Sequence, residues 1–162
     1  MTTIQTLNKV VEIAERRRDV ALAALAQLQR EMQIAQDQMD QLEAYALEAQ
    51  QRWSARSSAG IDAALLHHHR HFLQKIEHAI DFQRGVLSSR EDMIAQHEQQ
   101  VRVAERDVAG LRKFTEKKIQ AQAQVMERRE QKHTDEMALT IHMRQRLALA
   151  QAHAQTLSRS GA

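Results

Sequence analysis

Four histidines close together are the residues of this chain best suited to chemistry. They are His67, His68, His69 and His71, and two of them, His67 and His71, lie four positions apart. On a helix this spacing places two imidazoles on one face, where both can bind one metal ion. The next turn of that face carries Lys75, not a carboxylate or another histidine. The pattern therefore favours an exposed patch next to the turn over a metal site.

Other residue types that could support catalysis are not arranged for it. The acidic pairs Glu91-Asp92 and Asp135-Glu136 are adjacent residues, which point about 100° apart on a helix and so favour solvation over acid–base work. The sequence has no phosphate-binding loop or nucleophile motif, and its lack of cysteine excludes disulfides and thiolate metal sites. We therefore expect neither an enzyme nor a bound cofactor.

A seven-residue repeat of apolar side chains dominates the chain from residue 7 to residue 53. Thirteen of its fourteen positions are apolar, and Arg18 is the exception. The positions are Leu7, Val11, Ala14, Arg18, Ala21, Leu25, Leu28, Met32, Ala35, Met39, Leu42, Ala46, Ala49 and Trp53. A stripe with this period stays on one side of a helix and requires a partner helix in a left-handed coiled coil.

A second repeat follows the densest cluster of helix-breaking residues, at 57–62. Gly60 is suited to end the first helix in a left-handed conformation, and Asp62 to cap the next one, with Ile61 and Leu66 as a hydrophobic staple. The second repeat consists of Leu66, Leu73, Ile80, Leu87, Ile94, Val101 and Val108. Its companion row is mixed and consists of Ile76, Gln83, Arg90, His97, Ala104 and Leu111. A turn this short predicts antiparallel neighbours, in which facing residue numbers add up to about 117.

These patterns predict an all-α fold, an antiparallel two-helix coiled-coil hairpin with an extended second helix. The absence of proline and the aromatic content of 3% agree with a narrow helical seam and not with a thick core. We expect one coiled-coil unit over 1–162, with helix 1 at about 3–56, a turn at 57–61 and helix 2 at about 62–157. Residues 112–157 should overhang the first helix.

The charge of the chain is concentrated in its last third. Residues 111–162 carry ten Lys or Arg and five Asp or Glu, a local charge of +5. Such a basic end favours an acidic protein surface as partner, and the lack of interleaved aromatic residues argues against nucleic acid. The polar N-terminus and the absence of an apolar stretch of about 18 residues predict a cytoplasmic protein without signal peptide or membrane span.

Local patterns along residues 7–85 resemble those of the flagellar FliJ family, the stalk of the type III export ATPase. They are Leu7-x6-Ala14-Glu15-x5-Ala21-x3-Leu25, Gln38-x3-Leu42-x2-Tyr45, Ser58-Ala59-Gly60-Ile61 and Phe72-x3-Ile76-x2-Ala79-Ile80. The resemblance implies a central stalk that promotes assembly and activity of a hexameric export ATPase. It also implies contact with the cytoplasmic domain of the membrane export gate and the escort of export chaperones.

The resemblance also implies the residues that contact the export gate. Carried over position by position, they are Gln38, Leu42, Tyr45, Phe72, Ile76 and Ala79. Two positions depart from the family pattern, since Ala49 replaces an aromatic residue and Gln83 replaces a histidine. Leu42 and Ile76 also fall in the apolar rows, where the repeat by itself predicts core packing.

The basic clusters near both termini are the predicted ATPase-ring contacts. They are Arg16, Arg17, Arg112, Lys113, Lys117 and Lys118. The predicted location is the cytoplasm at the base of the flagellar export apparatus, peripheral to the membrane through partners only. A stalk of an injectisome, a self-associating structural coiled coil and a nucleic-acid-binding helical protein remain as alternatives.

Overall fold

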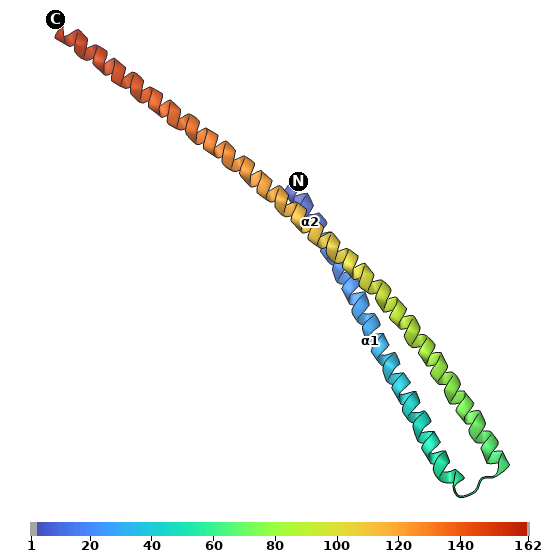
Figure 1. The fold of residues 1–162 in the computed structure, drawn as a ribbon. Helices are drawn as coiled ribbons and strands as arrows, with labels where there is room; N and C mark the ends of the chain where they lie inside the picture. The colour runs from blue at the N-terminus through green and yellow to red at the C-terminus, as the bar shows by residue number, and fades with distance from the viewer. Residues whose placement is uncertain (1–2, 162) are drawn as a thin grey trace. The chain divides into compact units, whose positions relative to one another are not determined.

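The computed structural model describes residues 3–161, which form two long helices and no strand. Helix α1 spans Thr3–Ser57 and helix α2 spans Ala63–Ser160. Figure 1 shows α1 and the first part of α2 side by side, antiparallel and joined by a short loop. The predicted all-α hairpin is confirmed. Met1, Thr2 and Ala162, at the ends of the predicted unit, lie outside the described residues.

The chain divides into two compact units, each of which is described by itself. The hairpin unit is Lys9–Leu111, and the second unit combines Met1–Asn8 with Arg112–Ala162. In the described part of the second unit Thr115 is buried, whereas every residue from Glu116 to Gly161 is exposed. The arrangement of residues 1–162 as a single coiled-coil unit stays a prediction.

The core of the hairpin unit is a narrow seam between α1 and α2. Its buried apolar residues are Ala14, Leu28, Ala35 and Met39 of α1 and Ile76, Val101 and Val108 of α2. All seven belong to the predicted repeats or their companion row. Because this seam is only one or two side chains wide, the unit depends on apolar packing along its whole length.

Polar groups interrupt the seam near its middle and fix the pairing of the two helices. Gln83 is 8% exposed, and its Nε2 donates a hydrogen bond of 2.8 Å to the backbone oxygen of Ala35. About two turns further along α2, Arg90 forms an ion pair with Glu31 of α1. A single polar residue in a coiled-coil seam selects one register, because any shift would leave it buried without its partner.

The turn between the helices matches the sequence pattern in detail. Gly60 has a φ of +93°, a left-handed conformation in which a side chain is strained. The backbone N–H of Gly60 donates to Ser57 O at 3.4 Å, and that of Ala59 donates to Arg56 O at 3.2 Å. The first helical bond of α2 joins Leu66 N to Asp62 O at 3.1 Å, which makes Asp62 the N-cap residue.

Candidate protein-binding surfaces

The gate-binding residues predicted from the family resemblance include two aromatic side chains that meet across the hairpin. Tyr45 of α1 and Phe72 of α2 pack edge to face, with ring centroids 5.8 Å apart and planes at 80°. Tyr45 remains 51% exposed, while Phe72 is half-buried because the Tyr45 ring covers part of it. The pair thus offers a rigid aromatic surface that both helices support.

A shallow hollow of about 360 Å³ lies next to this aromatic pair. Gln38, Leu42 and Tyr45 line it together with Gln41 and Gln83. Gln38 is exposed and accepts a hydrogen bond of 3.3 Å on its Oε1 from Gln83 Nε2. The side chain that replaces the family's histidine therefore holds one of the predicted gate residues in place.

The other two predicted gate residues on α2 differ in their accessibility. Ile76 is 6% exposed and packs in the seam, as its place in the companion row predicts, so it supports the surface from beneath. Ala79 is half-buried. The surface that a partner can touch is accordingly formed by Gln38, Tyr45 and Phe72, with Leu42 and Ala79 at its margins. We call these five residues the aromatic patch.

A second aromatic contact lies closer to the turn, and the sequence patterns did not single it out. The rings of Trp53 and His69 are stacked at 3.8 Å with an interplanar angle of 3°. Both rings line a hollow of about 200 Å³ with Tyr45 and Phe72. Part of the signal was present, because His69 stands one heptad before Ile76 in the companion row, but the sum of about 117 pairs Trp53 with Ala64 instead.

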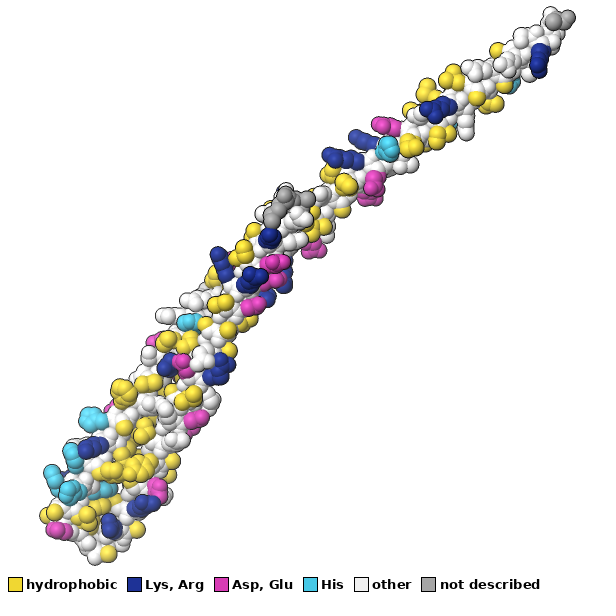
Figure 2. All heavy atoms as spheres, turned by 180° about the vertical axis from the view of Figure 1, so that it is seen from behind, with side chains coloured by type: hydrophobic (Ala, Val, Ile, Leu, Met, Phe, Trp, Pro, Cys, Tyr) yellow, Lys and Arg dark blue, Asp and Glu magenta, His cyan; other side chains and the backbone are white. Residues whose placement is uncertain are grey.

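The histidine cluster forms an exposed patch near the turn. Figure 2 shows histidine side chains gathered beside apolar ones at this end of the hairpin unit. Among the described residues, no group of three or more His, Cys, Asp or Glu side chains is arranged to hold a metal ion. His69 is half-buried against Trp53, and His67, His68 and His71 are exposed.

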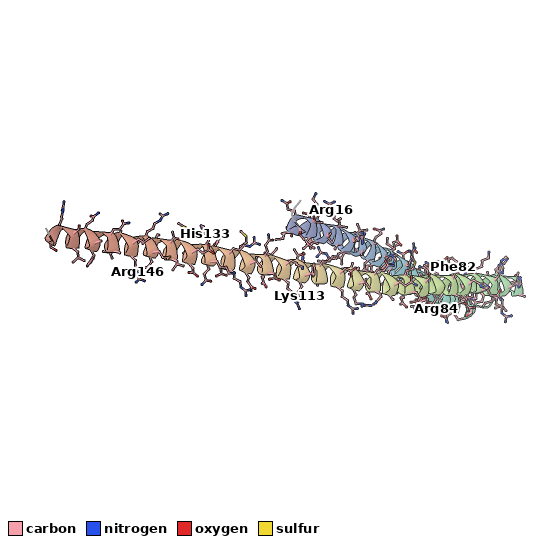
Figure 3. All side chains as sticks on the ribbon, turned by 90° about the horizontal axis from the view of Figure 1, so that it is seen from above. Arg16, Phe82, Arg84, Lys113, His133 and Arg146 are labelled. Atoms are coloured by element: carbon pink, nitrogen blue, oxygen red, sulfur yellow. The ribbon has the colours of Figure 1, made fainter. Side chains whose placement is uncertain are left out.

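The predicted ATPase-ring residues are exposed in both units. In the hairpin unit, Arg16 and Arg17 lie near its open end, which is the end away from the turn, where the unit begins at Lys9 and ends at Leu111. Neither arginine makes an ion pair within the described residues 3–161. In the second unit, Lys118 Nζ lies 5.4 Å from the centroid of the Phe114 ring. Figure 3 shows the Lys113 side chain extending away from the α2 ribbon. Arg112 and Lys117 are also exposed.

The second unit also exposes an unusual number of large apolar side chains. They are Phe114, Ile119, Val125, Met126, Met137, Leu139, Ile141, Met143, Leu147, Leu149 and Leu157, each at least 43% exposed. After Glu136 the helix carries three arginines and no acidic residue. Neither described helix has a stretch apolar enough to cross a membrane. Large apolar side chains exposed in this number on one segment are typical of a helix that binds a partner.

Comparison with known proteins agrees with the geometry of the hairpin. The family model described as flagellar FliJ protein matches residues 3–147, which is most of the chain and includes both helices of the hairpin unit. No curated protein and no solved structure gives a significant match. Because the family match covers the aromatic patch, the turn and the basic clusters together, the chain belongs to the flagellar FliJ protein family.

Proposed function

We propose that this chain is a coupling protein of the flagellar type III export ATPase. Membership of the FliJ family makes it a flagellar export-related component. The finer roles, proposed here, are binding to the hexameric ATPase ring and promotion of its assembly and activity in the cytoplasm. Contact with the cytoplasmic domain of the export gate and escort of export chaperones complete the proposal.

The exposed part of α2 is the observation that carries the proposal. Ten large apolar side chains lie on a helical segment without any buried residue between Glu116 and Gly161. Ten Lys or Arg and five Asp or Glu follow residue 111, so a partner surface must be both apolar and acidic. A ring ATPase with an acidic, apolar-lined pore has this chemistry.

The aromatic patch supports contact with a second partner. Tyrosine and phenylalanine are efficient contact residues because they bury a large area at low cost in side-chain entropy. Tyr45 already holds its ring against Phe72, so little conformational freedom is lost on binding. In this proposal the patch binds the cytoplasmic domain of the export gate.

The gate assignment is tested by the double variant Tyr45→Ala/Phe72→Ala. Its binding to the purified cytoplasmic domain of the gate, measured by calorimetry, should fall by about tenfold or more, because two contact side chains are lost. Phe82→Ala is the matched control, since Phe82 is 74% exposed and lies outside the patch. Equal binding of the double variant and the wild type would remove the gate from the proposal.

A further inference from the structure

An apolar groove lies between the two helices near the open end of the hairpin unit, away from the aromatic patch. Its volume is about 580 Å³. Its lining residues are Val10, Ile13, Ala14 and Arg17 of α1 and Gln99, Gln100, Val103, Ala104, Asp107 and Leu111 of α2. Three of the side chains facing it are exposed although they are apolar, with exposed fractions of 38% for Val10, 50% for Ile13 and 46% for Val103.

The seam of the coiled coil does not account for this groove. Of the seam side chains at this level, Ala14, Ala104 and Leu111 line the groove, and the two small alanines form its floor. Val20, 69% exposed, extends the apolar wall of α1 beside Arg16 and Arg17. Helix α1 thus has an apolar arc wider than a two-stranded coiled coil needs, and such a width is typical of a helix with two neighbours.

The dimensions of the groove fit a helix. From Val10 to Arg17, the α1 residues that line the groove, the helix advances about 10 Å, or about two turns, at 1.5 Å per residue. The small alanines of the floor allow another helix to approach closely, because the distance between helix axes depends on the side chains at the contact.

The charges around the groove define its occupant. Arg17 lines the groove and Arg16 lines the adjoining hollow formed with Ile13 and Val20, and neither arginine has an ion-pair partner within residues 3–161. Asp107 is the one acidic residue that lines the groove. The acidic residues of this part of α1 are elsewhere. Glu12, Glu15 and Asp19 lie about 120° or more around the helix from the centre of the groove face.

We propose that this groove binds an acidic amphipathic helix of a partner protein, which completes a local three-helix bundle. The apolar face of that helix packs on Val10, Ile13 and Val103, and its flanking carboxylates pair with Arg16 and Arg17. This inference extends the proposed function, since it rests on Arg16 and Arg17 facing a partner. The test of this inference uses no ATPase. A negative result would therefore contradict the helix-binding groove without contradicting the proposed coupling function, and the reverse also holds.

The probe is a synthetic peptide of three heptads with Leu and Ile at the core positions and Glu at the flanking positions. Its partner peptide is identical except for Lys in place of Glu. Binding of both to the full-length protein is measured by fluorescence anisotropy at two salt concentrations. The Glu peptide should bind, and more tightly at low salt, while the Lys peptide should bind at least about tenfold more weakly.

Two variants locate the binding site. Ile13→Glu should weaken binding of the Glu peptide by about tenfold or more, since it places a carboxylate in the apolar wall. Leu47→Glu is the matched control, because Leu47 is 57% exposed on α1 but does not line the groove, and it should bind like the wild type. Circular dichroism of both variants should show the helical content of the wild type, which checks that a loss of binding is not a loss of fold.

Several outcomes overturn the proposal. The first is that the Glu peptide does not bind, and the second is that the Lys peptide binds equally well. The third is that Ile13→Glu and Leu47→Glu weaken binding of the Glu peptide by the same factor. Sedimentation of the protein alone tests the remaining occupant, a second copy of this chain. A dimer that Ile13→Glu dissociates would assign the groove to self-association and contradict a partner helix.

Discussion

The buried amide of Gln83 allows a sharp prediction about what holds the hairpin in register. Gln83→Ala removes the hydrogen bond of 2.8 Å from Nε2 to Ala35 O, together with the buried stem of the side chain. The carbonyl of Ala35 lies inside α1, where the helix itself supplies a donor, so no acceptor is stranded. A net bond is worth about 0.5–1.5 kcal/mol and a buried methylene about 0.8 kcal/mol. The free energy of unfolding should therefore fall by about 1–2 kcal/mol.

Gln83→Met is the matched control, because it keeps the length of the side chain and loses only the hydrogen bond. Its free energy of unfolding should stay within about 1 kcal/mol of the wild type, since apolar contact offsets the lost bond. The assay is urea unfolding followed by fluorescence of Trp53, the only tryptophan, which stacks on His69 inside the hairpin unit. The reasoning is refuted if Gln83→Ala has no measurable effect, or if Gln83→Met loses as much as Gln83→Ala.

Three further predictions concern the stability of the hairpin, each read from the same fluorescence transition. Gly60→Ala should destabilise by about 1–2 kcal/mol because φ is +93°, whereas Gly110→Ala, in a helix with open space around it, should stabilise by about 0.5–1 kcal/mol. If Gly60→Ala and Gly110→Ala lowered the free energy of unfolding by the same amount, the explanation from backbone conformation would be contradicted. Ile76→Ala should cost about 2–4 kcal/mol, but Tyr45→Ala at most about 1 kcal/mol, since only Ile76 is buried. A larger loss from Tyr45→Ala would make Tyr45 a core residue. Glu31→Gln should cost no more than about 1 kcal/mol because its ion pair with Arg90 is one-third exposed, and a larger loss would mean that the pair is not screened by solvent.

The sequence predicts the hairpin well because the fold depends on one dominant signal. A period of seven, one cluster of breakers and a left-handed glycine define two helices, their direction and their pairing. Tyr45 faces Phe72, as the short turn predicts. The position of Ile76 in the companion row likewise predicts its burial.

Side chains that leave the seam are harder to predict from a repeat. The stacking of Trp53 on His69 and the bond from Gln83 to Ala35 depend on rotamers, which heptad positions do not specify. The repeats did not predict the groove beside Ile13 and Val103 for a related reason. Val10, Ile13 and Val103 lie outside the apolar rows, and only the pairing of the helices brings them together.

The central claim is that the ATPase and the export gate bind to different surfaces of this protein. The most direct test is stimulation of the purified flagellar export ATPase of the same organism by full-length Lys113→Glu/Lys117→Glu and Tyr45→Ala/Phe72→Ala variants. The charge-reversal variant should lose most of the stimulation, because it opposes an acidic partner surface, and increasing salt should weaken stimulation by the wild type. Arg56→Glu/Arg70→Glu, with the same change of charge near the turn, controls for net charge and should stimulate normally.

The Tyr45→Ala/Phe72→Ala variant should stimulate the ATPase as the wild type does. Full stimulation by Lys113→Glu/Lys117→Glu, or loss of stimulation by the aromatic variant alone, would contradict the separation of the two surfaces.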